Sequence, residues 1–180
     1  MATFVSLFRA INVGGNNLVR MDALKAMHEA LGLKNVSTYL QTGNVVFDSD
    51  DTDPNQLAAQ IAIEFEKTFG FRSEVMVRTA AELKEIFNKN PFYNQPEKET
   101  RWVAVIFLTA QPDQQAQQAL LNNYKGLEEL FVIDQELFVY YPDGIGRSKL
   151  TTAVIEKNLK VAGTGRNWNT VIKLLEMTQR

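Results

Sequence analysis

Apolar residues in the first half of the chain recur with periods that predict a β-α-β-β-α-β series. Runs rich in β-branched and aromatic residues indicate strands, whereas apolar positions three and four apart indicate helices. Asp53 before Pro54, and Thr79 three positions before Glu82, are typical of helix starts. The predicted elements are a strand at Thr3–Phe8, a helix at Met21–Leu31, strands at Val36–Leu40 and Val45–Phe47, a helix at Pro54–Phe69 and a strand at Val75–Val77. This order is that of a ferredoxin-like split unit.

Two polar loops of this unit are predicted to lie at the same end of its sheet. Arg9–Asn17 follows the first strand, and Gln41–Asn44 joins the two strands of a hairpin. The glycine at position 43 suits a turn with a positive backbone φ. Because the strands of such a unit alternate in direction, we expect the two loops to face each other.

The second half repeats the pattern after a polar connector. The connector, Asn90–Thr100, contains two prolines, so we expect domains at 1–90 and 91–180. Beyond it we predict a strand at Trp102–Leu108, a helix opening at Pro112, and strands at Phe131–Ile133 and Leu137–Tyr140. The predicted fold class is therefore α+β, with duplicated ferredoxin-like βαββαβ units built on a mainly antiparallel sheet.

After its hairpin, the second half is expected to diverge from the first. A polar loop at Tyr141–Lys149 leads to a helix around Thr151–Leu159. A further loop at Gly163–Asn169 leads to a last helix that contains Val171 and Leu175. We therefore expect two extra C-terminal helices that extend the second half.

Composition and charge narrow the function classes. The 180 residues include 19 basic and 21 acidic side chains, which argues against coating nucleic acid through bulk positive charge. Cysteine is absent, which excludes disulfides, thiolate zinc sites and cysteine nucleophiles. No apolar run reaches the roughly 18 residues of a membrane span, so we expect a cytoplasmic protein with no membrane partner.

No metal site is expected. The single histidine, His28, lies beside the apolar stripe of the first helix and is predicted to be a partly buried structural residue. The carboxylates at Asp48, Asp50, Asp51 and Asp53 lack the ligand spacing of a calcium loop. We expect them to form a solvated turn that caps a helix.

Two glycine-bearing loops are candidates for binding an anion. Arg9–Asn17 lets a ligand approach the backbone and precedes a helix, whose free N–H groups favour phosphate or carboxylate. The alternative is a loop whose asparagines satisfy local turn geometry. Gly144–Lys149 combines two glycines, two cations and a hydroxyl. Alternatively, Ser148 caps a helix while Arg147 and Lys149 are solvated charges.

A third candidate is Arg166–Thr170, where a cation, two amides and an indole meet at the start of the last helix. The alternative assigns Trp168 to the core and makes Asn167 or Asn169 the helix cap.

Aromatic residues suggest a different function. Phe4, Phe8, Tyr39 and Phe47 could line a sheet face, as stacking aromatics do in single-strand RNA-binding domains of related topology, unless helices or the second half cover that face.

Four stretches carry a family resemblance. They are Phe8–Asn17, Tyr39–Phe47, Tyr141–Ser148 and Arg166–Thr170. Together they closely resemble the family catalogued as domain of unknown function 1697, over essentially the whole chain. The resemblance implies a bacterial cytosolic protein with a ferredoxin-like α/β architecture, and it carries no catalytic assignment. Ala10 and Thr42 depart from the glycine and serine that the resemblance leads us to expect.

We hypothesise that the protein binds a small anionic ligand, phosphorylated or nucleotide-like, in a composite pocket formed by these polar loops. The residues assign no reaction, catalytic group, cofactor or oligomeric state. Two alternatives are a single-stranded nucleic-acid-binding module that uses the aromatic sheet face, and a regulatory or partner-binding domain without catalysis. The candidate ligand-binding residues are Arg9, Asn12, Gly14, Gly15, Asn16, Gln41, Asn44, Arg147, Ser148, Lys149, Arg166, Asn167 and Asn169.

Overall fold

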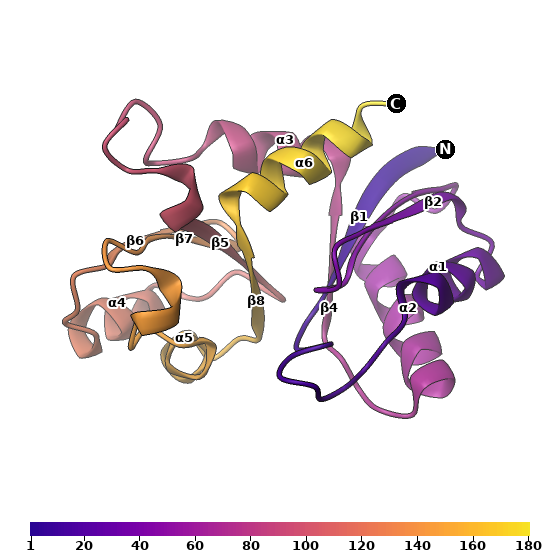
Figure 1. Cartoon of the computed structure of the whole chain (residues 1–180), viewed down its shortest axis with the longest axis horizontal. Helices are drawn as coiled ribbons and strands as arrows, with labels where there is room; N and C mark the ends of the chain where they lie inside the picture. Colours follow the sequence, from indigo (N-terminus) through magenta and orange to yellow (C-terminus); the bar gives the residue numbers. More distant parts are fainter. The chain divides into compact units, whose positions relative to one another are not determined.

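The computed structural model describes residues 1–180 and divides into two compact units (Figure 1). Unit 1 consists of Met1–Glu85 and Lys173–Arg180, and unit 2 consists of Ile86–Ile172. Each unit contains one four-stranded antiparallel sheet. No helix is both long enough and apolar enough to cross a lipid bilayer.

Unit 1 follows the predicted order of elements. They are β1 (Ala2–Phe8), α1 (Met21–Ala30), β2 (Lys34–Tyr39), β3 (Asn44–Ser49), α2 (Pro54–Phe69) and β4 (Val75–Thr79), followed by α3 (Ala80–Asn88). The strand order is β2-β3-β1-β4, with β1 antiparallel to both of its neighbours. This is the arrangement of a ferredoxin-like unit, and it confirms the prediction for the first half.

The core of unit 1 forms where α1 and α2 cover one face of this sheet (Figure 1). Alternate positions on the strands supply the sheet side of the core, and apolar helix positions supply the other side. Its buried members include Phe4, Phe8, Val45 and Phe47 from the strands and Leu24, Met27, Leu57, Ile61 and Phe65 from the helices. The start and end of α2 are those predicted: Asp53 accepts hydrogen bonds from two backbone N–H groups, and Gly70 adopts φ +80°.

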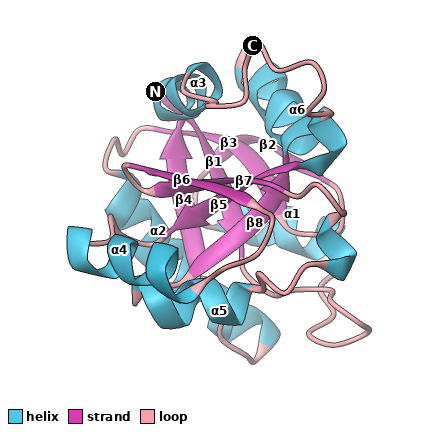
Figure 2. Cartoon of the chain, turned by 90° about the vertical axis from the view of Figure 1, so that its left-hand side faces the viewer, coloured by secondary structure: helices cyan, strands magenta, loops and turns pink.

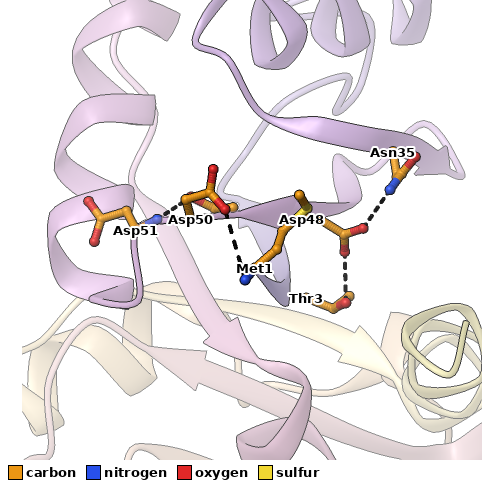
Figure 3. Close-up of polar contacts among 7 residues, drawn as sticks. Met1, Thr3, Asn35, Asp48, Asp50 and Asp51 are labelled. Carbon is orange, nitrogen blue, oxygen red and sulfur yellow. Dashed lines mark hydrogen bonds and ion pairs between the residues drawn. The ribbon is translucent and has the colours of Figure 1, made fainter.

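Asp48 ties three strands of this sheet together (Figure 3). Its two carboxylate oxygens accept hydrogen bonds of 2.7 Å from Thr3 Oγ1 and from Asn35 Nδ2. Burial raises the pKa of Asp48, but these two hydrogen bonds, together with the positive charges of Arg180 and the N-terminal amine, outweigh it and hold the pKa below its usual range. Asp51 accepts a hydrogen bond from the backbone N–H of Asp53. The prediction of a turn that caps a helix is confirmed for Asp53, which caps α2, but it is wrong for Asp48, which is buried within β3 and not solvated.

His28 lies in the core of unit 1. The residue is 0% exposed, and its ring packs against Phe8 and Phe47. Nδ1 lies 2.8 Å from the carbonyl oxygen of Leu24, and Nε2 lies 3.0 Å from Ser6 Oγ. Because a carbonyl only accepts, Nδ1 carries the proton and Nε2 accepts the Ser6 hydroxyl. The prediction of a structural histidine is confirmed, and its burial is more complete than expected.

Unit 2 has the same topology as unit 1. Its elements are η1 (Thr100–Trp102), β5 (Val103–Leu108), α4 (Gln114–Asn123), β6 (Glu129–Ile133), β7 (Glu136–Tyr140), η2 (Ile145–Arg147), α5 (Thr152–Leu159) and β8 (Gly163–Asn167), followed by α6 (Trp168–Thr178). The strand order is β6-β7-β5-β8. Helices α4 and α5 lie together on one side of the sheet (Figures 1 and 2) and contribute Leu120, Ile155 and Leu159 to its core.

The expected divergence of the second half is wrong, because Gly163–Asn167 forms strand β8 and not a loop. β8 pairs antiparallel with β5, from Gly163 opposite Leu108 to Asn167 opposite Ala104. Unit 2 therefore completes its own βαββαβ series. The two helices expected as extras are α5, which is the second helix of this series, and α6, which follows β8 as α3 follows β4.

Candidate functional site

The two polar loops of unit 1 are in contact, as predicted. Asn12 Nδ2 donates a hydrogen bond of 2.7 Å to the carbonyl of Gln41. The backbone N–H of Phe8 donates to the carbonyl of Gly43 at 3.0 Å. The loop after β1 and the β2–β3 turn therefore meet at one end of the sheet.

Asn12 holds this contact together with its whole side chain. Besides Gln41, its Nδ2 donates to the carbonyl of Val19 at 2.9 Å, and its Oδ1 accepts from the Val19 N–H at 2.7 Å. The residue also adopts φ +55°, a conformation that asparagine tolerates better than most residues. These hydrogen bonds to the backbone give Asn12 a role in building the loop, and its expected role in orienting a ligand stays a prediction.

The glycines at positions 14 and 15 form the turn of a small hairpin. Asn16 N donates to the Val13 carbonyl at 2.9 Å, and Asn12 N donates to the Asn17 carbonyl at 3.1 Å. Gly14 and Gly15 have φ +57° and +77°. A two-residue turn in which both central residues have positive φ requires such residues. The hairpin geometry explains both glycines, which lie with Asn16 at an exposed tip.

The expectation that this loop offers helix N–H groups to an anion is wrong. Helix α1 begins at Met21, after the hairpin, with Arg20 as its N-cap. The carboxylate of Asp22 accepts a hydrogen bond of 2.8 Å from the Ala23 N–H and pairs with Arg20 at 2.8 Å. The protein's own carboxylate therefore meets the positive end of this helix.

The remaining candidates in unit 1 divide into buried and exposed groups. Asn44 is 0% exposed and donates to the carbonyl of Tyr39 and to Thr42 Oγ1, so it holds the hairpin turn. Arg9 is half-buried, and its carbonyl accepts the Ser73 hydroxyl at 2.7 Å. The side chain of Gln41 is exposed.

Ala10 has φ +58°, a left-handed conformation that suits glycine. We expect Ala10→Gly to raise the free energy of unfolding by roughly 0.5–1 kcal/mol, because relief of about 1–2 kcal/mol of backbone strain exceeds the entropy cost of glycine. Urea denaturation measures the change. As a control, Ala59→Gly at an exposed position inside α2 is expected to lower stability by roughly 1 kcal/mol. A loss of stability in Ala10→Gly would contradict the prediction.

The two C-terminal polar stretches, residues 141–149 and residues 166–169 at the end of β8 and the start of α6, meet in unit 2 at the start of β5. The N–H of Tyr141 donates to the carbonyl of Trp102 at 2.8 Å. Asn167 Nδ2 donates to the carbonyl of Arg101, also at 2.8 Å. Residues 141–149 and 166–169 are thus both attached to η1. The structure groups the four polar loops as two pairs, one in each unit.

A hollow of about 620 Å³ opens beside η1 and is lined by Trp102, Pro142, Asp143 and Arg147. Arg147 ends η2, is exposed and forms no ion pair. Lys149 is a second exposed cation close to it in the sequence. Gly144 lies directly before η2 and has φ +86°, a backbone conformation that favours glycine.

Ser148 is not the N-cap of α5, because Thr151 caps that helix by accepting a hydrogen bond from the Val154 N–H. Ser148 Oγ donates instead to Glu128 Oε1 at 2.6 Å, and the Tyr124 hydroxyl donates to the other oxygen of the same carboxylate. Burial raises the pKa of Glu128, but these two hydrogen bonds, together with one from its own backbone, outweigh it and lower the pKa. The carboxylate thus anchors the chain directly after Arg147.

Tyr141 completes this cluster. Burial, assisted by the negative charge of Glu128, raises the pKa of Tyr141 to about 12, so its hydroxyl stays protonated. Sequence reasoning missed Tyr124 and Glu128, which lie in the connection between α4 and β6. No motif marks such isolated residues; only the folded chain brings them to Ser148.

Arg166 lies within β8 and is 6% exposed. Its Nη1 donates to Thr164 Oγ1 at 2.7 Å and to the Gly165 carbonyl at 2.9 Å. Burial lowers the pKa of Arg166 to about 10, which leaves it charged at neutral pH. Because of this burial, we leave Arg166 out of the group of exposed cations.

At the start of α6, the alternative in which Trp168 belongs to the core and an asparagine caps the helix is correct. Asn167 Oδ1 accepts the Asn169 N–H at 2.9 Å, as a cap does, and the Asn169 side chain is exposed. Trp168 is 4% exposed and stacks on Phe87, with ring centroids 5.5 Å apart. The prediction that this indole is a core anchor is confirmed.

The aromatic sheet face is not available to stack bases. Phe4, Phe8 and Phe47 are each 0% exposed and lie in the core cluster that includes residues of α1 and α2. Phe4 stacks on Phe47 within that core. The alternative in which helices cover this face is correct, so the motivation for a nucleic-acid-binding face is lost. No three histidine, aspartate or glutamate side chains gather as metal ligands.

Comparisons with known proteins support the fold. The conserved bacterial protein SP0830 from Streptococcus pneumoniae has a solved structure that matches 99% of this chain with 99% of its own, at 24% sequence identity and a TM-score of 0.77. A comparison with curated proteins found no match. Residues 1–138 match the family described as "Protein of unknown function (DUF1697)". The chain therefore belongs to the DUF1697 family.

Proposed function

We propose that the protein binds a small anionic ligand in the hollow of unit 2, with Arg147 as the group that holds the anion. The proposed pocket is composed of residues from η1 and from the polar loop after β7. The observation that carries the proposal is an exposed guanidinium that lines a hollow and has no ion-pair partner.

The chemistry of the lining residues suits such a ligand. A guanidinium presents a flat fork of N–H donors that matches phosphate and carboxylate oxygens. The volume of about 620 Å³ lies in the usual range for small-molecule sites. Directly after Arg147, the backbone is anchored by the hydrogen bond from Ser148 to Glu128.

Calorimetric titration with pyrophosphate at constant ionic strength tests the proposal. We expect Arg147→Ala to weaken binding roughly 10-fold or more, because a hydrogen bond to a charged group contributes about 1.5–3 kcal/mol. Arg147→Lys keeps the charge but loses the fork, so we expect an intermediate loss. The matched control is Lys157→Ala, which removes an exposed cation from α5 and is expected to leave binding unchanged.

Two results would overturn the proposal. One is the absence of any heat of binding up to millimolar pyrophosphate, which would favour a regulatory or partner-binding domain. The other is an equal effect of Arg147→Ala and Lys157→Ala, which would assign any binding to nonspecific surface charge.

A further inference from the structure

The indole of Trp102 also lines the hollow, although binding an anion does not require an aromatic ring. Trp102 is half-buried at the end of η1, directly before β5. Its Cζ3 atom lies 3.2 Å from the point that a Cβ on Gly144 would occupy. The ring is thus packed against the loop that carries Arg147, and a residue without a Cβ makes this approach possible.

The other tryptophan is used differently. Trp168 is almost fully buried and stacks on Phe87, which accounts for its ring by packing alone. The Trp102 ring instead lines a hollow, and the guanidinium of the exposed Arg101 lies 4.9 Å from the ring centroid. The indole therefore already has one flat, exposed group beside its ring, a guanidinium that also pairs with Glu99 at 2.7 Å.

The charges of the hollow also favour a particular kind of ligand. Asp143 and Arg147 line it together but form no ion pair with each other. The carboxylate of Asp143 accepts hydrogen bonds from N–H groups, whereas the guanidinium of Arg147 donates hydrogen bonds to an anion. A ligand that satisfies both side chains carries an anion at one end and N–H donors at the other. Pro142, directly before Asp143 in the sequence, adds an apolar surface to the lining of the hollow.

We infer that the ligand of this hollow is a nucleotide whose base carries an amino group, with the base stacked on Trp102, its amino group donating to Asp143 and its phosphate held by Arg147. This inference rests on the proposed function and specifies the ligand class. Nucleobases are flat and stack on aromatic side chains, and such stacking contributes enough to change affinity roughly 10-fold or more.

Affinities of a ligand series test each part of the inference. Adenosine 5′-monophosphate is expected to bind at least 10-fold more tightly than ribose 5-phosphate, which has the phosphate but no base. Inosine 5′-monophosphate lacks the amino group and is expected to bind more weakly than the adenosine compound. The Asp143→Asn variant is expected to reduce this preference for the amino group, since the amide no longer offers a charged acceptor.

Fluorescence identifies the residue that stacks. In a Trp168→Phe variant, Trp102 is the only tryptophan, so a change in emission on adding adenosine 5′-monophosphate reports on the hollow. Trp102→Phe is expected to keep part of the preference for the base, and Trp102→Ala is expected to abolish it. Circular dichroism verifies that each variant is folded, and the emission titration gives a result even where Trp102→Ala does not fold.

The possible results separate this inference from the proposed function. If ribose 5-phosphate and pyrophosphate bind through Arg147 but the adenosine compound binds no better, the inference fails and the anion site stands. If the fluorescence emission of Trp102 stays constant while adenosine 5′-monophosphate binds, the base does not stack on Trp102 and the inference is wrong. If none of the probes binds, both proposals fail.

Discussion

Replacing Gly43 with alanine is expected to lower the free energy of unfolding by roughly 2–5 kcal/mol. Gly43 has φ +87°, which costs a residue with a Cβ about 1–2 kcal/mol. The added Cβ would also lie 2.6 Å from Ile11 Cδ1 and 2.9 Å from Phe8 Cβ. Both neighbours are core residues that cannot move aside freely, and such overpacking costs roughly a further 1–3 kcal/mol.

Gly70→Ala provides a matched control for this prediction. Gly70 has φ +80° at the end of α2, but nothing lies within 4 Å of its Cβ position. Its substitution therefore includes the backbone strain without the steric clash. Urea denaturation of both variants gives the difference, and equal losses of stability would show that the contact between the hairpin turn and the Ile11 side chain is looser than described.

The second large effect is a loss of stability in acid caused by His28. Burial lowers its pKa from 6.5 to about 4, because the core cannot solvate an imidazolium. Between these two values the unfolded chain binds more protons than the folded chain, so stability falls as pH falls through this window. The pKa difference corresponds to about 3 kcal/mol, fully present above pH 6.5 and lost as pH approaches 4.

A comparison with His28→Gln isolates this effect from the titration of carboxylates, which both proteins share. We expect the stability difference between the wild type and the variant to shrink by about 3 kcal/mol from pH 7 to pH 4. Because the chain has one histidine, NMR observes its titration directly. A midpoint near 6.5 in the folded protein, or a stability difference that does not change with pH, would contradict the prediction.

The first half of the fold could be predicted from sequence because local and global signals agree there. The capping box is an example: Thr79 N donates to Glu82 Oε2 at 2.8 Å, and Glu82 N donates to Thr79 Oγ1 at 3.0 Å. The glycine of the β2–β3 turn has the positive φ that its position demanded. Each of these features depends on residues within a few positions of one another.

β8 could not be predicted, because Gly163–Asn167 contains no large apolar residue. Its glycines instead permit close packing on the neighbouring strand: a Cβ on Gly163 would lie 2.8 Å from Ile106 Cγ2. The strand exists because of its partner β5, and pairing of this kind over long sequence separation leaves no periodic pattern. Tertiary context overrides strand propensity at such positions.

The candidate site was only partly predictable for a similar reason. The loop with Arg147 was recognised from its glycines and cations, and Asn12 was recognised as important in its own loop. The role of Asn12 depends on Val19 and Gln41, which sequence alone does not bring together. Trp102 was interpreted as the start of a buried strand, and its position beside Gly144 follows only from the return of the chain after β7.

The repeated topology shows what the fold requires of the connection between its first strand and first helix. In unit 2, Thr109–Asp113 is enough to join β5 to α4. In unit 1, the equivalent connection is Arg9–Arg20, with a hairpin of its own and an asparagine that anchors it. The five residues of the shorter connection therefore suffice to close the same topology, and the additional residues of the longer one form a structure of their own.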